Sequence, residues 1–389
     1  MPDKKELNKR IIVTGGGSGG HISAASSVIK SITSKYHISK ENFLYIGGDL
    51  GMVGEDKGNS LEMRLFKEET FPRAYIRAGK LQRSFDLESL KLLLRTFLGF
   101  IDSYKTIKTF KPDILISTGG FVSVPVCIVG KLFKAKIYLH EQTASVGLAN
   151  KIISSISDQI FVTYPSSERY FPKEKVVHTG NLVRDEIFER NARGQLKDIL
   201  AEMVSRQEQY PLVYISGGGL GSHVLNTTVQ EHMKYLVEHF QILIQTGDNK
   251  VFNDYEKLLL ERKRLDTDQQ SRVEIVKYVG NEDIGYLLNN IDVFVGRSGA
   301  NTVYEMGILK IPSIFIPIPW VTNHEQEKNA EILVNTGLAK IIREGELTGE
   351  KLLLELKHMK EEEREIDYKA LKEIFILDAN KKILKAIGI

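Results

Sequence analysis

The amino-acid sequence predicts an α/β protein made of two similar domains, each built around a parallel β-sheet. Three observations lead to this prediction. The chain has 389 residues, enough for two or three domains at roughly 100–200 residues each. A glycine-rich segment occurs twice, as IIVTGGGSGGH at 11–21 and as VYISGGGLGSH at 213–223. Short apolar, β-branched runs alternate with helix-like runs in both halves of the chain.

The two copies of the glycine-rich segment set the domain boundaries. Their spacing is about half the chain, whereas a solenoid would repeat about every 20–50 residues. We therefore expect an N-terminal domain over 1–184 and a C-terminal domain over 185–376, with the charged segment 185–209 as the linker. The last helix, over 377–387, has apolar residues near helical spacing and is expected to pack back on the first domain.

The other strands are expected where short apolar runs are rich in β-branched residues, which is typical of strands buried on both faces. Their alternation with helices implies right-handed crossovers and parallel sheets. We expect helices after the glycine turns over 22–34 and 224–240, and strands over 42–46, 114–117, 136–140, 159–163, 212–215, 242–245, 273–277, 293–295 and 313–317.

The composition excludes several classes of protein. Apolar residues make up 42% and charged residues 26%, which excludes a disordered chain, a collagen-like fibre and a polytopic membrane protein. A single cysteine, Cys127, excludes a disulfide framework and a cysteine-based zinc site, and favours a reducing compartment. The first ten residues are polar and no apolar run approaches 18 residues, so we expect neither a signal peptide nor a membrane span.

The charge is distributed unevenly between the two halves. Residues 1–184 carry 27 Lys+Arg and 17 Asp+Glu, a net charge of +10, and residues 185–389 carry 26 and 33, a net charge of −7. The overall charge of +3 is too small to indicate a nucleic acid, and we expect none as a partner. A basic half favours an anionic membrane surface or another polyanion, although uneven scatter of surface charge is the alternative.

A glycine-rich turn between a strand and a helix exposes backbone N–H groups and is typical of an anion site. Three nucleotide chemistries use such turns. Gly15, Gly17 and Gly20 satisfy G-x-G-x-x-G, but the acidic residue expected about 20 residues later for a dinucleotide is missing there. A phosphate-binding P-loop needs Lys followed by Ser or Thr, and His21 and Ile22 occupy those positions.

A nucleotide-sugar transferase with two domains explains why the turn occurs twice. One turn would hold the donor diphosphate and the other would approach the acceptor. A metal-dependent transferase would need a D-x-D pair at the end of a strand. The D-x-D run Asp266–Asp268 lies in a polar stretch that indicates an exposed loop, so we expect no metal site and no cofactor. Leaving-group charge would then be met by a helix N-terminus and a basic side chain.

Five motifs in order resemble the MurG family of UDP-N-acetylglucosamine:undecaprenyl-diphospho-muramyl-pentapeptide N-acetylglucosaminyltransferases. They are TGGGSGGH at 14–21, TGGFVSVP at 118–125, HEQTASVGLANK at 140–151, GNLVR at 180–184 and RSGANTVYE at 297–305. The resemblance implies a GT-B fold, in which two Rossmann-like domains with parallel sheets face each other across a cleft. It also implies an inverting, metal-independent hexosyltransferase that uses UDP-GlcNAc as a substrate.

The resemblance implies a reaction and a location as well. GlcNAc would be transferred to the MurNAc 4-hydroxyl of lipid I, a polyprenyl-diphospho-MurNAc-peptide, to form lipid II for peptidoglycan. The enzyme would be peripheral, at the cytoplasmic face of the bacterial cell membrane. The residues that would bind the donor by this resemblance are Ser18, Gly19, Gly20, Thr143, Arg184, Gly219, Val279, Ala300, Asn301, Thr302, Val303, Tyr304, Glu305 and Gln326.

Within that set the residue types suit the expected roles. The guanidinium fork of Arg184 suits phosphate oxygens, and the carboxylate of Glu305 can accept two hydrogen bonds from ribose hydroxyls. Val279 would receive the uracil through its backbone. Thr143 replaces the family's usual Asn and Gly219 its usual Ser, which leaves the identity of the transferred sugar open.

Two residues compete for the role of general base. His21 stands near the start of a helix, where the positive end of the helix dipole favours a neutral imidazole. Glu141 follows a buried strand and is the rival, either as the base or as the group that orients His21. A purely structural role in holding the loops is the remaining interpretation for both.

The segment 73–100 mixes basic and apolar side chains, which is typical of a surface that binds anionic lipids. An amphipathic core helix with ordinary surface lysines is the alternative. The side chains expected in the membrane patch are Arg77, Lys80, Leu81, Arg83, Phe85, Lys91, Arg95 and Phe97.

Two other functions stay open on the sequence alone. One is a glycolipid synthase of the same architecture that transfers a sugar from a UDP-sugar to diacylglycerol, which the Thr143 and Gly219 departures permit. The other is a non-catalytic protein of the same fold that binds a nucleotide sugar. The presence of His21, Glu141, Arg184 and Glu305 together argues against the latter.

Overall fold

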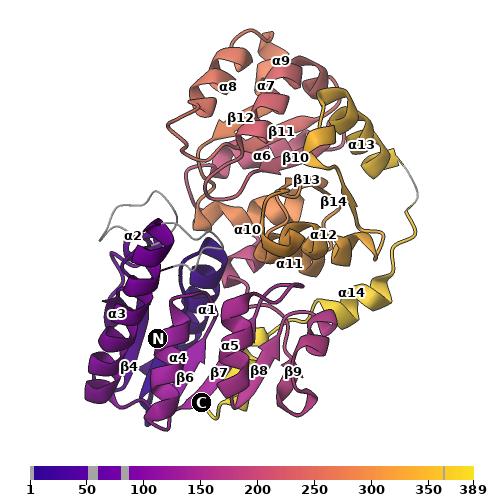
Figure 1. Ribbon diagram of the computed structural model, residues 1–389. Coiled ribbons are helices and arrows are strands. Elements are labelled where there is room, and N and C mark those ends of the chain that lie inside the picture. Colours follow the sequence, from indigo (N-terminus) through magenta and orange to yellow (C-terminus); the bar gives the residue numbers. More distant parts are fainter. Residues whose placement is uncertain (1–3, 51–59, 80–86, 362–363) are drawn as a thin grey trace. The chain divides into compact units, whose positions relative to one another are not determined.

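The computed structural model describes residues 4–50, 60–79, 87–361 and 364–389 and divides the chain into two units. Unit 1 comprises residues 1–183 and 376–389, and unit 2 comprises residues 184–375. Each unit is built around a single large parallel sheet with helices on both faces, as the alternation of strands and helices predicts (Figure 1). The predicted α/β class and the parallel sheets are confirmed.

Seven strands form the sheet of unit 1, in the order β5-β4-β2-β6-β7-β8-β9. All of its pairings are parallel. The strands are β2 (Ile11–Thr14), β4 (Phe43–Gly48), β5 (Arg73–Ile76), β6 (Ile114–Ser117), β7 (Lys136–Glu141), β8 (Gln159–Val162) and β9 (Val176–His178), and β1 (Lys5–Glu6) pairs separately with β3 (Tyr36–His37). The helices are α1 (Gly19–Lys35), α2 (Leu61–Leu65), α3 (Leu87–Phe110), α4 (Ser123–Leu132), α5 (Leu148–Ile156) and α15 (Ala379–Ala386), with short helices η1 (Pro165–Tyr170) and η2 (Lys173–Lys175).

Alternating strand residues supply the two cores of unit 1, because successive side chains of a strand point to opposite faces. Ile11 and Val13 of β2 join the core under α1 and α15, whereas Ile12 joins the core under α3, α4 and α5. Ile383 and Leu384 of α15 are almost completely buried in the first of these cores. The end of the chain therefore completes the amino-terminal unit.

Six strands form the sheet of unit 2, in the order β12-β11-β10-β13-β14-β15, and all pairings are parallel. The strands are β10 (Leu212–Ser216), β11 (Gln241–Gln245), β12 (Val273–Val276), β13 (Val293–Gly296), β14 (Ser313–Phe315) and β15 (Ala339–Ile341). The helices are α6 (Lys197–Ser205), α7 (His223–Val237), α8 (Asp254–Arg262), α9 (Thr267–Ser271), α10 (Asn281–Asn290), α11 (Ala300–Leu309), α12 (Glu325–Val334), α13 (Gly349–Glu361) and α14 (Tyr368–Ile374), with η3 (Asp185–Phe188), η4 (Thr322–His324) and η5 (Glu344–Glu346).

The segment 185–209, expected to be a linker, is folded into unit 2 and that prediction is wrong. It contains η3 and α6, and the side chains of Ile187 and Leu200 are fully buried. The backbone N–H groups of Gly194 and Leu196 donate to the carboxylate of Asp283 on α10. Its many charges lie on the solvent side, which is why the sequence resembles a linker.

Along the described residues, no helix combines the length and the apolar character that crossing a membrane requires. Asp266 and Asp268, which we expected to lie in an exposed loop, are exposed, but they lie at the start of the short helix α9. Asp266 caps α9 through the N–H of Gln269 at 2.8 Å, and Asp268 forms an ion pair with Arg272. Both carboxylates therefore have structural partners.

Replacing Ile383 tests the contribution of α15 to unit 1. Ile383→Ala removes a buried side chain from the core under α1, so we expect the free energy of unfolding to fall by about 2–4 kcal/mol. Urea denaturation followed by circular dichroism measures it. The exposed Lys385→Ala on the same helix should leave the value unchanged. Equal stability of the wild type and Ile383→Ala would show that α15 contributes nothing to this core.

Candidate active site

The two glycine turns lie at equivalent places in the two sheets. In unit 1 the turn follows β2, at the point where β4 pairs on one side of that strand and β6 on the other. In unit 2 the turn follows β10, between β11 and β13. Ligands of open parallel sheets bind at the carboxyl ends of strands where the strand order reverses, and both turns lie at such a position.

The first turn is packed against protein on several sides. A Cβ atom on Gly15 would lie 1.9 Å from Oγ1 of Thr118, and one on Gly17 would lie 2.2 Å from the ring of Phe121. Gly17 also has a φ of +77°, which only glycine adopts without strain. The hydroxyl of Tyr45 donates to the carbonyl of Gly15 at 2.7 Å. Gly15 and Gly17 therefore serve close packing.

The second turn is open at its middle. A Cβ atom on Gly218 or Gly219 would meet no other atom within 4 Å, and the same is true of Gly299, the residue before α11. Gly299 offers no side-chain cap, so the first N–H groups of α11 are not capped by it. Unit 2 therefore offers space and polarised N–H groups for an anion, as expected of a diphosphate site.

His21 lies in the first turn of α1 and is held by the carbonyl of Thr118. Its Nδ1 is 2.8 Å from that oxygen. A carbonyl accepts hydrogen bonds only, so Nδ1 carries the proton and the neutral ring keeps its lone pair on Nε2. Burial lowers the pKa of His21, and the Thr118 carbonyl opposes this shift only in part. The sequence predicted a neutral imidazole from the helix dipole, whereas burial is the larger cause.

The same carbonyl oxygen also accepts from the side chain of Gln142. The Nε2 atom of Gln142 lies 3.0 Å from the Thr118 oxygen and 3.4 Å from Nδ1 of His21. The hydroxyl of Thr118 in turn donates to the backbone carbonyl of His21 at 2.8 Å. The predicted motifs at 118–125 and 140–151 thus supply the groups that orient the ring of His21.

Glu141, the rival base, is fully engaged with its own loop. Its Oε1 accepts from the N–H of Thr143 at 3.0 Å, and its Oε2 accepts from Nδ2 of Asn150 at 2.9 Å. The hydroxyl of Thr143 lies 2.9 Å from Oε1 and 2.6 Å from the carbonyl of Ser145. Burial raises the pKa of Glu141. These contacts fit a carboxyl group that holds the loop.

Arg184 and Glu305, both expected at the donor, bind each other within unit 2. The Nε of Arg184 donates to one carboxylate oxygen at 3.0 Å and its Nη2 to the other at 3.1 Å. Only 10% of the Glu305 side chain is exposed. One edge of the guanidinium is used in this pair, which leaves the N–H groups of Nη1 for another acceptor.

The backbone N–H of Val279, expected to contact uracil, donates to Oε1 of Gln245 at 3.0 Å. The same oxygen accepts from the hydroxyl of Tyr214 at 3.1 Å, and Nε2 of Gln245 lies 3.3 Å from the carbonyl of Gly218. Burial raises the pKa of Tyr214 to about 12, so its hydroxyl remains a donor. Gln245 therefore links Val279 to the second glycine turn, a role that no motif predicts.

The other expected donor residues divide between surface and core. Ala300, Asn301 and Thr302 form the partly exposed first turn of α11, whereas Val303 and Tyr304 are fully buried. The ring of Tyr304 packs against Phe375 at 5.1 Å. The side chains of Val303 and Tyr304 thus belong to the core of unit 2, and the expectation that these two residues bind the donor stays a prediction.

Four other expected donor residues have definite places. Oε1 of Gln326 accepts from the backbone N–H of Ile318 at 3.0 Å. Ser18 precedes α1 without capping it through its side chain, and Gly20 has its nearest side-chain neighbour, Gln142, at 3.7 Å from a Cβ placed on it. Gly19 and Gly20 are exposed, so the start of α1 faces solvent.

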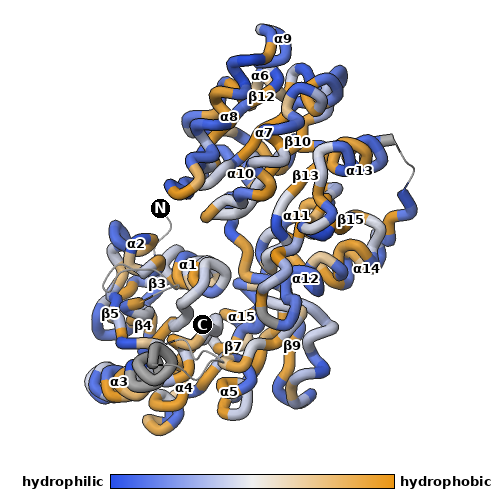
Figure 2. The backbone as a smooth tube through the Cα atoms, turned by 45° about the horizontal axis from the view of Figure 1, so that its top comes forward, coloured by the Kyte–Doolittle hydropathy of each residue, from blue (hydrophilic) through white to orange (hydrophobic). Residues whose placement is uncertain are grey.

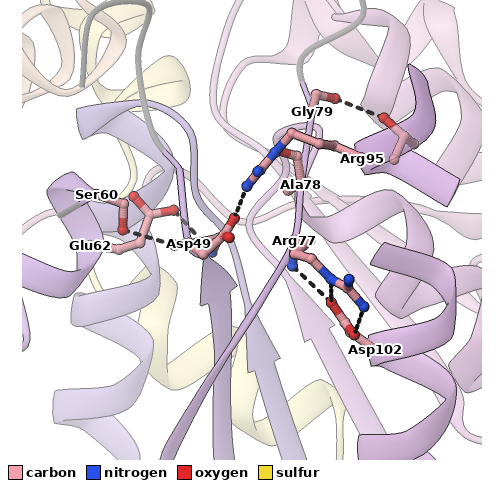
Figure 3. A network of polar contacts seen from close by, with 10 residues as sticks. Asp49, Ser60, Glu62, Arg77, Ala78, Gly79, Arg95 and Asp102 are labelled. Carbon is pink, nitrogen blue, oxygen red and sulfur yellow. Dashed lines mark hydrogen bonds and ion pairs between the residues drawn. The ribbon is translucent and has the colours of Figure 1, made fainter. Parts of the chain in front are cut away.

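The expected membrane patch is only partly within the described residues. Lys80, Leu81, Arg83 and Phe85 lie outside them, and Lys91 is placed only as a residue of α3. Arg77 forms a bidentate ion pair with Asp102, and Arg95 contacts Asp49 at 2.6 Å (Figure 3). Both arginines therefore form ion pairs that link α3 to the ends of β5 and β4. Phe97 is 64% exposed.

In the part of the chain that the structure describes, no three His, Cys, Asp or Glu side chains are grouped so that they could hold a metal ion. His223, the counterpart of His21, has a different partner. Its Nδ1 lies 2.8 Å from Asp254 Oδ1, and Phe252 stacks on its ring at 3.9 Å. The repeated histidines are thus alike in sequence and different in environment.

Comparison with known proteins gives a consistent result. The model of the glycosyltransferase family 28 N-terminal domain matches residues 11–162, and that of the family 28 C-terminal domain matches residues 212–386. A protein of Desulforamulus reducens named UDP-N-acetylglucosamine--N-acetylmuramyl-(pentapeptide) pyrophosphoryl-undecaprenol N-acetylglucosamine transferase is 34% identical over 355 residues, 90% of each chain. A Thermoanaerobacter protein of the same name is 32% identical over 97% of this chain and 99% of its own.

Solved structures show the same fold. The crystal structure of Acinetobacter baumannii MurG superimposes with a TM-score of 0.66 at 21% identity, and covers 97% of this chain and 99% of that one. The order of the strands in both units agrees with two Rossmann-like domains. The GT-B class expected from the sequence is therefore confirmed.

The buried His140, next to Glu141, generates a prediction about pH. Its Nε2 lies 3.0 Å from the carbonyl of Gly180, and burial lowers its pKa to about 4. The unfolded chain binds a proton at this residue below about pH 6.5, and the folded protein does so only near pH 4. The free energy of unfolding therefore decreases as the pH is lowered from about 6.5 to about 4, by about 3 kcal/mol in total from this residue.

We expect His140→Gln, which keeps a donor for the Gly180 carbonyl, to lose that part of the pH dependence. Urea unfolding at several pH values between 7.5 and 4.5 measures the slope for both proteins. His239→Gln, at an exposed histidine, is the matched control and should keep the wild-type slope. Parallel curves for the wild type and His140→Gln would show that His140 does not titrate differently in the two states.

Proposed function

Since the chain belongs to glycosyltransferase family 28, we propose that it transfers N-acetylglucosamine from UDP-GlcNAc to the 4-hydroxyl of the N-acetylmuramyl sugar of a polyprenyl-diphospho-linked acceptor. The names of its relatives, at 32–34% identity over at least 90% of the chain, support the donor and the acceptor. The observation that carries the chemistry is the hydrogen bond between Nδ1 of His21 and the Thr118 carbonyl, because it leaves Nε2 as a free base.

The proposed step is a single displacement at the anomeric carbon. Nε2 of His21 takes the proton of the acceptor hydroxyl, and the hydroxyl oxygen bonds to the anomeric carbon from the face opposite the diphosphate. The bond between that carbon and the diphosphate oxygen breaks, and UDP departs with the electron pair. The product has the inverted configuration. Glu141 then acts as the residue that positions the loop of Thr143 and Asn150.

Unit 2 is proposed to hold the UDP group. The open glycines 218 and 219 and the start of α11 offer N–H groups to the phosphates, which balance the charge that develops on the leaving group. Arg184 adds a positive charge through its second edge, while its first edge neutralises Glu305. The remaining lone pairs of Glu305 are available to a ribose hydroxyl. UDP-GlcNAc is a substrate, and we propose no separate cofactor.

The decisive experiment measures turnover with a purified lipid-linked acceptor and labelled UDP-GlcNAc. We expect His21→Ala to lower kcat by about 10²–10⁴-fold, the usual contribution of a general base, with UDP affinity unchanged. Glu141→Gln keeps a side chain that can accept hydrogen bonds, so its kcat should fall less than that of His21→Ala. If His21→Ala retained full turnover, His21 would not be the base.

A donor and acceptor panel separates the proposal from its alternatives. Transfer to diacylglycerol and not to the lipid-linked sugar would favour the glycolipid synthase. Binding of UDP without turnover of any donor would favour a non-catalytic protein. Because UDP affinity is measured separately, a failure of folding is distinguished from a failure of catalysis.

We also propose that unit 1 binds the cytoplasmic face of an anionic membrane through α3, α4 and α5. The helix α4 contacts α3 on one side and α5 on the other, and Phe133 at its end contacts the ring of Tyr104 on α3 at 5.5 Å. Apolar segments of these helices are visible in Figure 2. Exposed apolar side chains lie among exposed lysines here, namely Phe97, Ile101, Tyr104, Leu132, Leu148 and Ile152 beside Lys105, Lys108, Lys131, Lys134 and Lys151.

Vesicle binding tests this surface. We expect the wild type to bind vesicles that contain anionic lipid more tightly than neutral vesicles, since each nearby basic residue contributes about 1 kcal/mol. Phe97→Ser with Leu132→Ser should weaken binding by about tenfold or more through lost apolar burial. Leu260→Ser, at an exposed leucine of unit 2, is the control. Equal sedimentation of the wild type with both kinds of vesicle would contradict the proposal.

A further inference from the structure

Glu62 is a fully buried carboxylate that neither the motifs nor the proposed mechanism includes. It is the second residue of α2, whose start is capped by the hydroxyl of Ser60 through the N–H of Met63 at 3.3 Å. The same hydroxyl donates to the carbonyl of Gly48 at 2.8 Å. Figure 3 shows Ser60 and Glu62 beside the end of β4, next to Asp49. The segment thus places a carboxyl group at the carboxyl end of the sheet.

The carboxylate of Glu62 reaches the first glycine turn. Its Oε1 accepts from the backbone N–H of Gly17 at 3.3 Å and from that of Gly48 at 3.2 Å. A Cβ atom on Gly16 would lie 2.3 Å from this oxygen. One on Gly47 would lie 3.1 Å from Cγ of Glu62. The glycines that follow β2 and those that end β4 therefore leave the space that this side chain fills.

The second glycine turn has no such carboxylate among the groups that the structure places near it. A Cβ atom on Gly218 or Gly219 would meet nothing within 4 Å. The helix that follows the neighbouring strand there, α8, also begins with an acidic residue, Asp254. Its carboxylate, however, accepts from Asn226 at 2.9 Å and pairs with His223. The two units use an equivalent acidic residue differently.

We propose that Glu62 is the built-in anion of the first glycine turn. Its carboxylate takes a place that a phosphate oxygen takes at such turns, holds the turn that leads into His21, and keeps phosphate groups away from it. The first turn is then reserved for an uncharged group, a sugar hydroxyl or an amide of the acceptor. Glu62 is in this sense both a positioning residue and a specificity-determining residue for the proposed transfer.

The electrostatic argument follows from burial. A carboxylate removed from water repels a second anion far more strongly than one at the surface, because the surrounding dielectric is low. Tyr45, whose hydroxyl donates to Gly15, responds to the same environment: burial and then the charge of Glu62 raise its pKa well above the usual value. The negative charge of Glu62 would repel a diphosphate at this turn, whereas it would not repel an uncharged hydroxyl group.

The test adds inorganic pyrophosphate to the full-length protein saturated with UDP and follows the ring resonances of His21 by NMR. Glu62→Gln keeps a carbonyl oxygen that can accept from Gly17 and Gly48, and removes the charge. We expect no saturable shift of His21 in the wild type. In Glu62→Gln we expect a saturable shift, with a dissociation constant about tenfold or more below the highest pyrophosphate concentration tested. Glu68→Gln, an exposed residue shortly after α2, should behave as the wild type.

A kinetic arm tests the positioning role, which rests on the proposed function. Glu62→Ala leaves two N–H groups without their acceptor, so kcat should fall by about tenfold or more while UDP affinity stays unchanged, and Glu62→Gln should restore most of kcat. If the role of Glu62 were purely structural, Glu62→Ala and Glu62→Gln would both have a lower unfolding temperature. The loss of kcat at unchanged UDP affinity, and its recovery in Glu62→Gln, would then not be seen.

Two outcomes would overturn the proposal. One is a saturable His21 shift with pyrophosphate that is as strong in the UDP-saturated wild type as in Glu62→Gln. The other is an unchanged kcat in a folded Glu62→Ala. If the wild type bound no UDP, the proposed function would fail, yet the comparison of pyrophosphate binding between the wild type and Glu62→Gln would still decide the role of Glu62.

Discussion

The hydrogen bond from His21 to the Thr118 carbonyl is the constraint on which the proposed chemistry depends. A carbonyl oxygen cannot donate, so it fixes both the tautomer and the orientation of the imidazole ring. The second donor to the same oxygen, Gln142, comes from the end of a different strand. Three strand ends thus meet at one backbone atom. A parallel sheet makes this possible, because the carboxyl ends of its strands lie along one edge.

The two glycine turns are similar in sequence but differ in their surroundings and in their proposed roles. The two turns share four glycines, a helix follows each, and each carries a histidine at the same place. In unit 1 the surrounding side chains fill the turn, and in unit 2 its middle is open. The difference lies in the acidic side chain that a neighbouring helix places at each turn. Glu62 contacts the first turn, whereas Asp254 contacts His223 and leaves the second turn unfilled. Duplicated backbone geometry is therefore compatible with different ligands.

Sequence reasoning predicted the interior of the fold well and its margins poorly. Buried strands such as β6 and β10 are continuous apolar runs, so their positions follow from composition. The strands β5, β9 and β15 lie at sheet edges, where residues such as Arg73 and Lys340 interrupt the apolar pattern, and no run predicts them. Within the site, a motif led to His21, whereas Thr118 begins another motif without its role being predicted. Glu62 and Gln245 belong to no motif, since their roles depend on tertiary contacts between distant segments.

The membership of α15 in unit 1 has a consequence for how the chain is made. The core under α1 includes Ile383, Leu384 and Ile387, which follow the whole of unit 2 along the chain. During translation the complete set of unit 1 strands leaves the ribosome first, and the whole of unit 2 follows before this core can close. Until α15 has been synthesised, the apolar residues of unit 1 that it covers are therefore exposed. Such transiently exposed apolar surface is what chaperones bind.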